Sequence, residues 1–171
     1  GRFSGSSVPS TQRATGSAIT VRFTTDGSVV RDGFTASFSC DGVRSCDGLL
    51  VDLGQQLSPY LGDTSRTGDN YDLSCGGSGN EAMFSILLQS GQTIDIGRDS
   101  NAYDSRHETS WGGNCPGQHI VACTDDPDTR RHQWTNNEGS PQTLFFVIGA
   151  YSSSSGAFTL SWSVSPSAEV S

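Results

Sequence analysis

The chain has 171 residues and a net charge of −8 at neutral pH, and all ten of its basic residues are arginine. An acidic chain of this kind offers no basic face to a phosphate backbone, so we expect no nucleic acid among its partners. Hydrophobic residues make up 33% and charged residues 16%, and there are 21 glycines, which is a polar, turn-rich composition. The longest apolar runs fall far short of the ~20 residues of a bilayer-spanning helix, so we expect no membrane span.

Short alternating or β-branched runs, separated by Gly, Asp, Asn and Ser, occupy most of the chain, whereas helical periodicity is almost absent. The first two predicted strands, residues 18–24 and 34–39, flank two Asp-Gly turn signals. Further strands are predicted at residues 49–53, 82–88, 92–97, 119–123, 131–135, 144–149 and 157–164. Because no crossover helices separate these strands, the pattern predicts an all-β sandwich rather than a parallel sheet.

The five cysteines lie in glycine-rich loops and lack the paired C-x-x-C spacing of a zinc site: Cys40, Cys46, Cys75, Cys115 and Cys123. We predict disulfides formed in an oxidising compartment rather than reduced buried thiols. A Pro-Gly turn directly after Cys115 favours a hairpin bridge to Cys123, provided that the Cα atoms come within roughly 4.4 to 6.8 Å. One of the other three cysteines would then be left over, and the sequence does not identify it.

The three histidines, His107, His119 and His132, do not have the i, i+4 spacing of a helical zinc motif. No Gly-x-Ser-x-Gly elbow is present between a strand and a helix. His119 falls in a predicted strand, as a core or cross-strand residue. Without a partner in reach an acid–base role has no support, and we therefore predict that the chain is not an enzyme.

Carboxylates gather in two predicted loops, one with Asp63, Asp69 and Asp72 and one with Asp125, Asp126 and Asp128. Closely spaced carboxylates repel one another unless a cation or an arginine neutralises them. Calcium is one candidate partner, and the adjacent Arg130 and Arg131 are another. The third interpretation is a solvated acidic loop that keeps the protein soluble.

Four aromatic residues lie in or beside predicted loops: Trp111, Trp134, Tyr103 and Tyr151. Flat rings exposed together stack on sugars or dock a neighbouring chain. The alternative is ordinary loop packing. These residues are the candidates for a binding surface.

Residues 19–28, Ile-Thr-Val-Arg-Phe-Thr-Thr-Asp-Gly-Ser, and residues 33–38, Gly-Phe-Thr-Ala-Ser-Phe, combine an alternating strand, a turn and a closing strand. This segment resembles the C-terminal half of a CUB domain, an extracellular β-sandwich of the jelly-roll kind. In calcium-binding CUB domains the aspartate of the turn helps to hold the ion, so the resemblance implies Asp26 as a calcium ligand. The other role open to Asp26 is to cap the turn.

Four later stretches, residues 64–77, 81–85, 115–126 and 146–164, are similar in order and spacing to the bacterial prepeptidase C-terminal (PPC) domain. That domain is a non-catalytic β-sandwich attached to many secreted bacterial proteins. Many of its members carry a cysteine after the second sheet strand that would pair with one like Cys75. Here that stretch reads Ile-Gly-Arg-Asp-Ser, and Cys46 or Cys40 is left to take the place.

The predicted organisation is a partial CUB-like module at residues 1–40, a linker at 41–47, a PPC-like β-sandwich at 48–164 and a linker or tail at 165–171. The fold class is all-β, an antiparallel jelly-roll-like β-sandwich preceded by the partial CUB-like sandwich. Two strands cannot close a sandwich, so the first module requires either an upstream segment or a strand from a neighbouring copy.

These features predict a non-catalytic adhesion or assembly module that is extracellular or on a cell surface, as a subunit or repeat of a surface or filamentous structure. The expected partners are other extracellular chains, copies of the same chain, or a glycan. Calcium is the one cofactor expected. The alternatives are an accessory domain of a secreted peptidase and a carbohydrate-binding module.

Overall fold

The computed structural model describes residues 22, 24, 27–28, 46 and 50–166. The chain divides into two units, Gly1–Ser39 and Cys40–Ser171, and nearly all described residues belong to the second. The strands predicted at 18–24 and 34–39, together with Asp26 and Cys40, lie outside the described residues. The part that is described contains no helix of a length and hydropathy that would let it span a bilayer.

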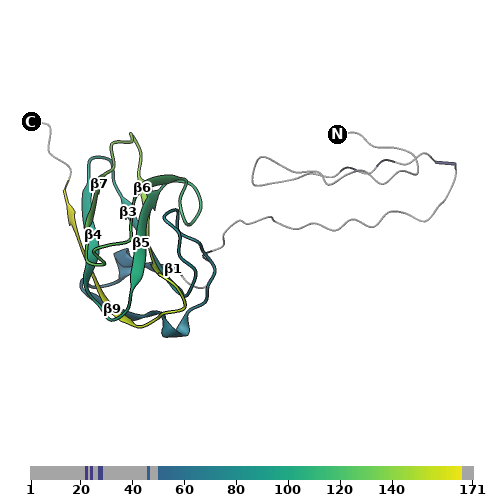
Figure 1. Ribbon diagram of the computed structural model, residues 1–171. Helices are drawn as coiled ribbons and strands as arrows, with labels where there is room; N and C mark the ends of the chain where they lie inside the picture. Colours follow the sequence, from purple (N-terminus) through teal and green to yellow (C-terminus); the bar gives the residue numbers. More distant parts are fainter. Residues whose placement is uncertain (1–21, 23, 25–26, 29–45, 47–49, 167–171) are drawn as a thin grey trace, which may run out of the picture. The chain divides into compact units, whose positions relative to one another are not determined.

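Nine strands of the described residues form two stacked sheets, as Figure 1 shows. The first sheet, in the order β1-β3-β8-β5-β6, consists of β1 (Leu50–Asp52), β3 (Glu81–Leu88), β8 (Gln142–Ala150), β5 (Ser105–Trp111) and β6 (His119–Thr124). The second, in the order β2-β9-β4-β7, consists of β2 (Tyr60–Asp63), β9 (Ala157–Ser165), β4 (Thr93–Asn101) and β7 (His132–Thr135). Each recorded strand pairing is antiparallel except that of β1 with β3. The predicted all-β sandwich is confirmed.

The sequence pattern misses two of these strands, β2 and β5. Strand β2 has only four residues, one of them glycine, and is followed by the short 3-10 helix η2 (Thr64–Arg66). Strand β5 reads Ser-Arg-His-Glu-Thr-Ser-Trp and has no apolar alternation, yet most of its residues are buried. A rule that recognises a buried strand by its hydrophobic residues cannot find one whose buried side chains are polar.

The main core lies between the two sheets. Its largest buried side chains come from β3, β4, β8 and β9, and include Phe84, Phe146, Ile94, Ile148 and Leu160. The Phe84 ring packs edge-on against Phe158, with ring centroids 6.0 Å apart. Burying side chains of this size contributes about 1.5–3 kcal/mol each, and this inter-sheet core is therefore the principal source of stability.

A second, smaller cluster lies on the outer face of the five-stranded sheet. Tyr71 and Leu73, from the connection that covers residues 64–80, pack there against Met83 and Val147 of the sheet. Gly149 of β8 leaves room for this connection, because a Cβ atom at that position would overlap the Leu73 side chain. The connection thus serves as the outer layer, although it contributes no strand.

The described residues contain two disulfides, and one of them, Cys75–Cys123, holds the connection at residues 64–80 to the sheet. Cys46 is bonded to Cys115 and Cys75 to Cys123, with Cα–Cα distances of 5.9 and 5.8 Å. The predicted Cys115–Cys123 bridge is wrong. Cys115 lies in the loop before β6, whereas Cys123 lies four residues along that extended strand from its start at His119. A rise of about 3.4 Å per residue places the two cysteines far beyond bonding distance.

Candidate functional site

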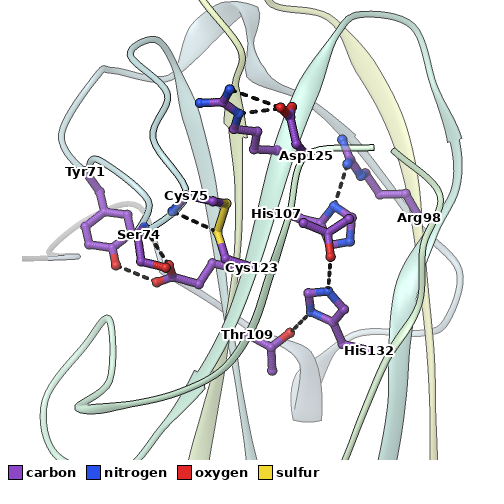
Figure 2. Close-up of a disulfide and its surroundings, with 12 residues drawn as sticks. Tyr71, Ser74, Cys75, Arg98, His107, Thr109, Cys123, Asp125 and His132 are labelled. Carbon is purple, nitrogen blue, oxygen red and sulfur yellow. Dashed lines mark hydrogen bonds and ion pairs between the residues drawn. A yellow bond between two sulfur atoms is a disulfide. The ribbon is translucent and has the colours of Figure 1, made fainter. Parts of the chain in front are cut away.

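A column of polar side chains runs through the sandwich interior along the inner face of β5. Ser105, His107 and Thr109 point inward from alternate positions of that strand and are fully buried. Arg98 of β4 and His132 of β7 reach them from the second sheet. Figure 2 shows Arg98, His107, His132 and Thr109 in this arrangement.

The protonation state of His107 follows from its partners. Its Nδ1 atom lies 2.8 Å from a guanidinium nitrogen of Arg98, and its Nε2 atom lies 2.7 Å from the carbonyl oxygen of Arg130. A guanidinium only donates hydrogen bonds, so Nδ1 accepts and the single ring proton sits on Nε2, which donates to Arg130. Burial, together with the nearby positive charge of Arg98, lowers the pKa of His107 to about 3. The ring is therefore neutral at physiological pH.

His132 is held in a similar way. Its Nδ1 atom lies 2.7 Å from the hydroxyl of Thr109 and its Nε2 atom 2.9 Å from that of Thr124. Burial, followed by the positive charges of Arg130 and Arg98, lowers the pKa of His132 to about 4. Both imidazoles have their nitrogen atoms engaged inside the protein, so neither is placed to exchange a proton with a substrate.

The opposite face of β5 carries a buried carboxylate that the sequence analysis did not single out. Glu108 accepts a hydrogen bond from the Tyr71 hydroxyl at 2.6 Å and another from the backbone N–H of Ser74 at 2.7 Å. Both donors belong to the connection at residues 64–80, and Figure 2 shows them beside the Cys75–Cys123 bond. Glu108 thus anchors the outer layer to the sheet.

The aspartates of the second acidic loop have arginine partners other than those predicted. Asp125 pairs with Arg106 of β5 at 3.0 Å, and Asp128 lies 3.5 Å from Arg98 and accepts from Ser105. The predicted partners Arg130 and Arg131 do not fill this role: the Arg131 guanidinium pairs with Asp95 and Asp99 instead. The prediction that the arginines adjacent in the sequence pair with these aspartates was wrong. Arg98 and Arg106 lie on strands, and their side chains reach across to residues of a neighbouring strand or of the other sheet.

The remaining acidic candidates show no common centre. Asp69, Asp72 and Asp126 are exposed. Asp69 lies near the buried Glu81. Burial raises the pKa of Glu81 to about 7, and the negative charge of Asp69 adds to this rise. Among the described side chains no three of His, Cys, Asp or Glu come together to hold a metal ion. Calcium binding, including any at Asp26, stays a prediction.

The four aromatic candidates separate into two places. Trp111 of β5 and Trp134 of β7 stack with ring centroids 5.2 Å apart, and Trp111 also stacks on His119 of β6 at 4.4 Å. Tyr103 packs against the main core, and Tyr151 is 48% exposed beneath the Arg106 guanidinium. The structure therefore brings together Trp111 and Trp134, adds His119 to them, and leaves the two tyrosines elsewhere.

Comparisons with known proteins bear on the CUB-like prediction. No family model matches the chain. Cubilin of Homo sapiens is 37% identical over 93 residues, which cover 54% of this chain and 2% of cubilin, so the chain spans a very small part of this relative. The match supports a CUB-like domain. Because the first unit ends at Ser39, a match of this length extends well into the second unit.

One solved structure is similar over a larger share of the chain. The crystal structure of Aeromonas hydrophila PliG, a periplasmic lysozyme inhibitor of g-type lysozyme, is 15% identical, and the similarity covers 68% of this chain and 96% of that one with a TM-score of 0.46. The resemblance to PPC domains stays a prediction.

Proposed function

We propose that the chain is a non-catalytic binding module of an extracellular or cell-surface protein. The observation that carries this proposal is that the ionisable side chains of β5 form hydrogen bonds inside the protein that support its structure. His107 and Glu108 are buried, and their hydrogen-bonding atoms are taken up by neighbouring residues that hold the two layers in place. Groups of this kind stabilise a scaffold, and a scaffold presents its loops to a partner.

The extracellular setting has two supports. Two disulfides close loops of 69 and 48 residues, and such bonds form and persist in oxidising compartments. The sequence match is to cubilin, a CUB-containing protein. An adhesion or interaction role in that setting is consistent with a rigid, cross-linked sandwich.

The proposal is tested by two measurements on the purified, oxidised chain. The first assays turnover of peptide, ester and glycoside reporter substrates; we expect none above the level of the His107→Gln variant. The second measures saturable binding to arrays of extracellular protein ectodomains and of glycans. Turnover that His107→Gln abolishes, or the lack of saturable binding to every member of both arrays, would overturn the proposal.

Self-assembly is a second candidate function, and one observation favours it. Strand β2 lies at an edge of the four-stranded sheet and pairs there with β9, while Leu61 on this strand and Leu57 just before it are 76% and 88% exposed. An open strand edge beside exposed leucines is suited to pairing with another copy of the chain.

Light scattering over a concentration series tests this second function. We expect the wild type to associate as concentration rises and Leu61→Lys to remain monomeric. Leu87→Lys is the matched control, because Leu87 is also exposed, at 57%, but lies on β3 of the other sheet. A wild-type chain that is monomeric at every concentration excludes assembly through this edge.

A further inference from the structure

The loops at the two ends of the sandwich differ in chemistry. The amide end comprises residues 89–92, 112–118 and 136–141, the connections β3–β4, β5–β6 and β7–β8. The charged end comprises residues 102–104, 125–131 and 151–156, the connections β4–β5, β6–β7 and β8–β9. In Figure 1 the amide end is the one toward which β9 runs as it approaches the C-terminus.

Among the loops of the two ends, charged side chains are almost confined to the charged end. Six charged residues lie in its loops: Asp104, Asp125, Asp126, Asp128, Arg130 and Arg131. The three loops of the amide end hold one charged residue, Glu138, against six carboxamides: Gln89, Gln92, Asn114, Gln118, Asn136 and Asn137. An amide both donates and accepts hydrogen bonds, as a sugar hydroxyl does.

The stacked aromatic residues lie at the same amide end. Trp111 and His119 are the residues that flank the 112–118 loop, and Trp134 comes from β7 of the other sheet, one residue before that strand ends. His119 is exposed and both indoles are half-buried. The three rings therefore span the two sheets next to the amide-bearing loops.

The loops around these rings are tied down. The Cys46–Cys115 disulfide holds the 112–118 loop. The buried side chain of Asn136 donates to the carbonyl oxygens of Leu88 and Ser140, and its own oxygen accepts from the N–H of Glu138. A surface fixed in this way loses little conformational freedom when it binds.

We propose that the amide end binds a neutral polysaccharide. Trp134 packs in part against the main core, and Trp111 stacks on both Trp134 and His119. The exposed imidazole, with the parts of the two indoles that these contacts leave open, offers apolar ring surface to the C–H faces of sugars. The exposed amides of Gln89, Asn114, Gln118 and Asn137 hydrogen-bond to hydroxyls. A chain of net charge −8 and no lysine repels sulfated or uronic polymers, which leaves the uncharged ones. This inference rests on the proposed function and names the class of ligand.

Affinity electrophoresis tests the inference, with the intact oxidised chain in gels that contain laminarin, galactomannan, xyloglucan or dextran, and with alginate and heparin as anionic counterparts. We expect retardation by at least one neutral polymer and by neither anionic one. Trp134→Ala and Trp111→Ala are each expected to weaken binding about three- to tenfold, the range that one aromatic contact supplies. Tyr151→Ala, an exposed aromatic at the charged end, is the matched control and retains full binding.

Folding of each variant is checked by a cooperative thermal melt. If a tryptophan variant does not fold, His119→Ala carries the test, because its ring is exposed and its removal leaves the core intact. Folded protein that none of the neutral polymers retards, or variants that bind as tightly as the wild type, would overturn the inference. Saturable binding to protein ectodomains in the absence of neutral-polymer binding would also overturn it while leaving the proposed function intact.

Discussion

The two faces of the five-stranded sheet are covered in different ways. The inner face packs on a second sheet, whose regular strands supply large apolar side chains such as Ile94 and Leu160 along with Arg98 and His132. The outer face is covered by the connection at residues 64–80, which contains no strand and buries only a few apolar side chains.

The difference shows what a covering segment needs when it lacks regular structure. A packed sheet satisfies its own backbone and contributes apolar area at every second residue. The outer connection instead depends on discrete anchors: the Cys75–Cys123 bond, the Glu108 carboxylate that accepts from Tyr71 and Ser74, and the fit of Leu73 over Gly149. The inner face is stabilised by a large buried apolar surface area, and the outer face by a few specific contacts.

Truncating a large side chain of the inter-sheet core should cost more stability than truncating its smaller neighbour on the outer face. Phe146 and Val147 are neighbours on β8 that point to the inner and outer faces and are both fully buried. We expect Phe146→Ala to lower the free energy of unfolding by about 3–5 kcal/mol, since it leaves a cavity between the sheets, and Val147→Ala to lower it by less. Urea denaturation of both variants measures this, and equal losses would contradict the comparison.

The outer face should be the more sensitive to loss of a covalent anchor. Replacing Cys75 and Cys123 with alanine opens a 48-residue loop, and we expect a loss of about 2–4 kcal/mol in the free energy of unfolding. Cleavage by a protease should then begin within residues 64–80 while the strands of both sheets stay protected. Cleavage that begins instead in the second sheet would show that this connection is not the weaker cover.

The two faces should respond to pH with opposite signs. The inner histidines have pKa values lowered from 6.5 to about 3 for His107 and about 4 for His132. Between pH 6.5 and these values the unfolded chain binds protons that the folded chain does not, so stability falls as the pH is lowered. The outer Glu81 has its pKa raised from 4.5 to about 7, so its contribution is complete below pH 4.5 and is lost as the pH rises through 7.

Urea midpoints measured from pH 3 to 8 resolve these two slopes. We expect His132→Gln to flatten the acidic side of the profile, and Glu81→Gln to flatten the side between pH 4.5 and 7. His107 keeps part of the acidic slope in the His132→Gln variant. An acidic slope as steep in that variant as in the wild type would mean that His132 is not protected from protonation.

The Glu108 anchor has a smaller expected effect. Tyr71→Phe removes the hydroxyl that donates to the Glu108 carboxyl group at 2.6 Å, and we expect a loss of about 1–3 kcal/mol because a buried acceptor then has one donor fewer. A double-mutant cycle with Glu108→Gln separates this contact from the packing of the ring. Additive effects would show that the hydrogen bond does not hold the connection down.

The smallest effect is expected on the outer face of the second sheet, where no layer formed by the described residues covers the side chains of Arg131, Asp95 and Asp99. Arg131 pairs with both aspartates, and all three side chains are at least 36% exposed. Such pairs contribute about 0–1 kcal/mol, so Arg131→Ala should change the urea midpoint little and less still at high salt. A larger loss would place this residue among the structural anchors.

Sequence reasoning succeeded where burial and hydrophobicity coincide and failed where they do not. The strands β3, β8 and β9 follow from their apolar residues, and so does the sandwich. Strand β5 was missed because Ser105, His107 and Thr109 are buried polar residues whose partners come from another sheet. No local pattern records such a partner, so neither the His107 column nor the Glu108 anchor was predicted.

The prediction of the disulfide pairing failed for a related reason. Cys115 and Cys123 are close in the sequence, but an extended strand carries them apart, and their true partners, Cys46 and Cys75, lie in segments that only the folded chain brings near. The sequence singled out Trp111 and Trp134 as binding candidates, and that role stays a prediction. Their stacking on each other and on His119 depends on which strands lie side by side, and so does their separation from the two tyrosines.

The bond between Cys46 and Cys115 has a mechanical consequence. Cys46 precedes β1, the short parallel strand at the margin of its sheet. Tension applied to the chain from its N-terminal side therefore passes through sulfur into the β5–β6 loop before it can peel β1 away. The pulling force therefore acts on the β5–β6 loop, near the opposite edge of the sheet, and we expect β1 to stay paired with β3 under tension from that direction.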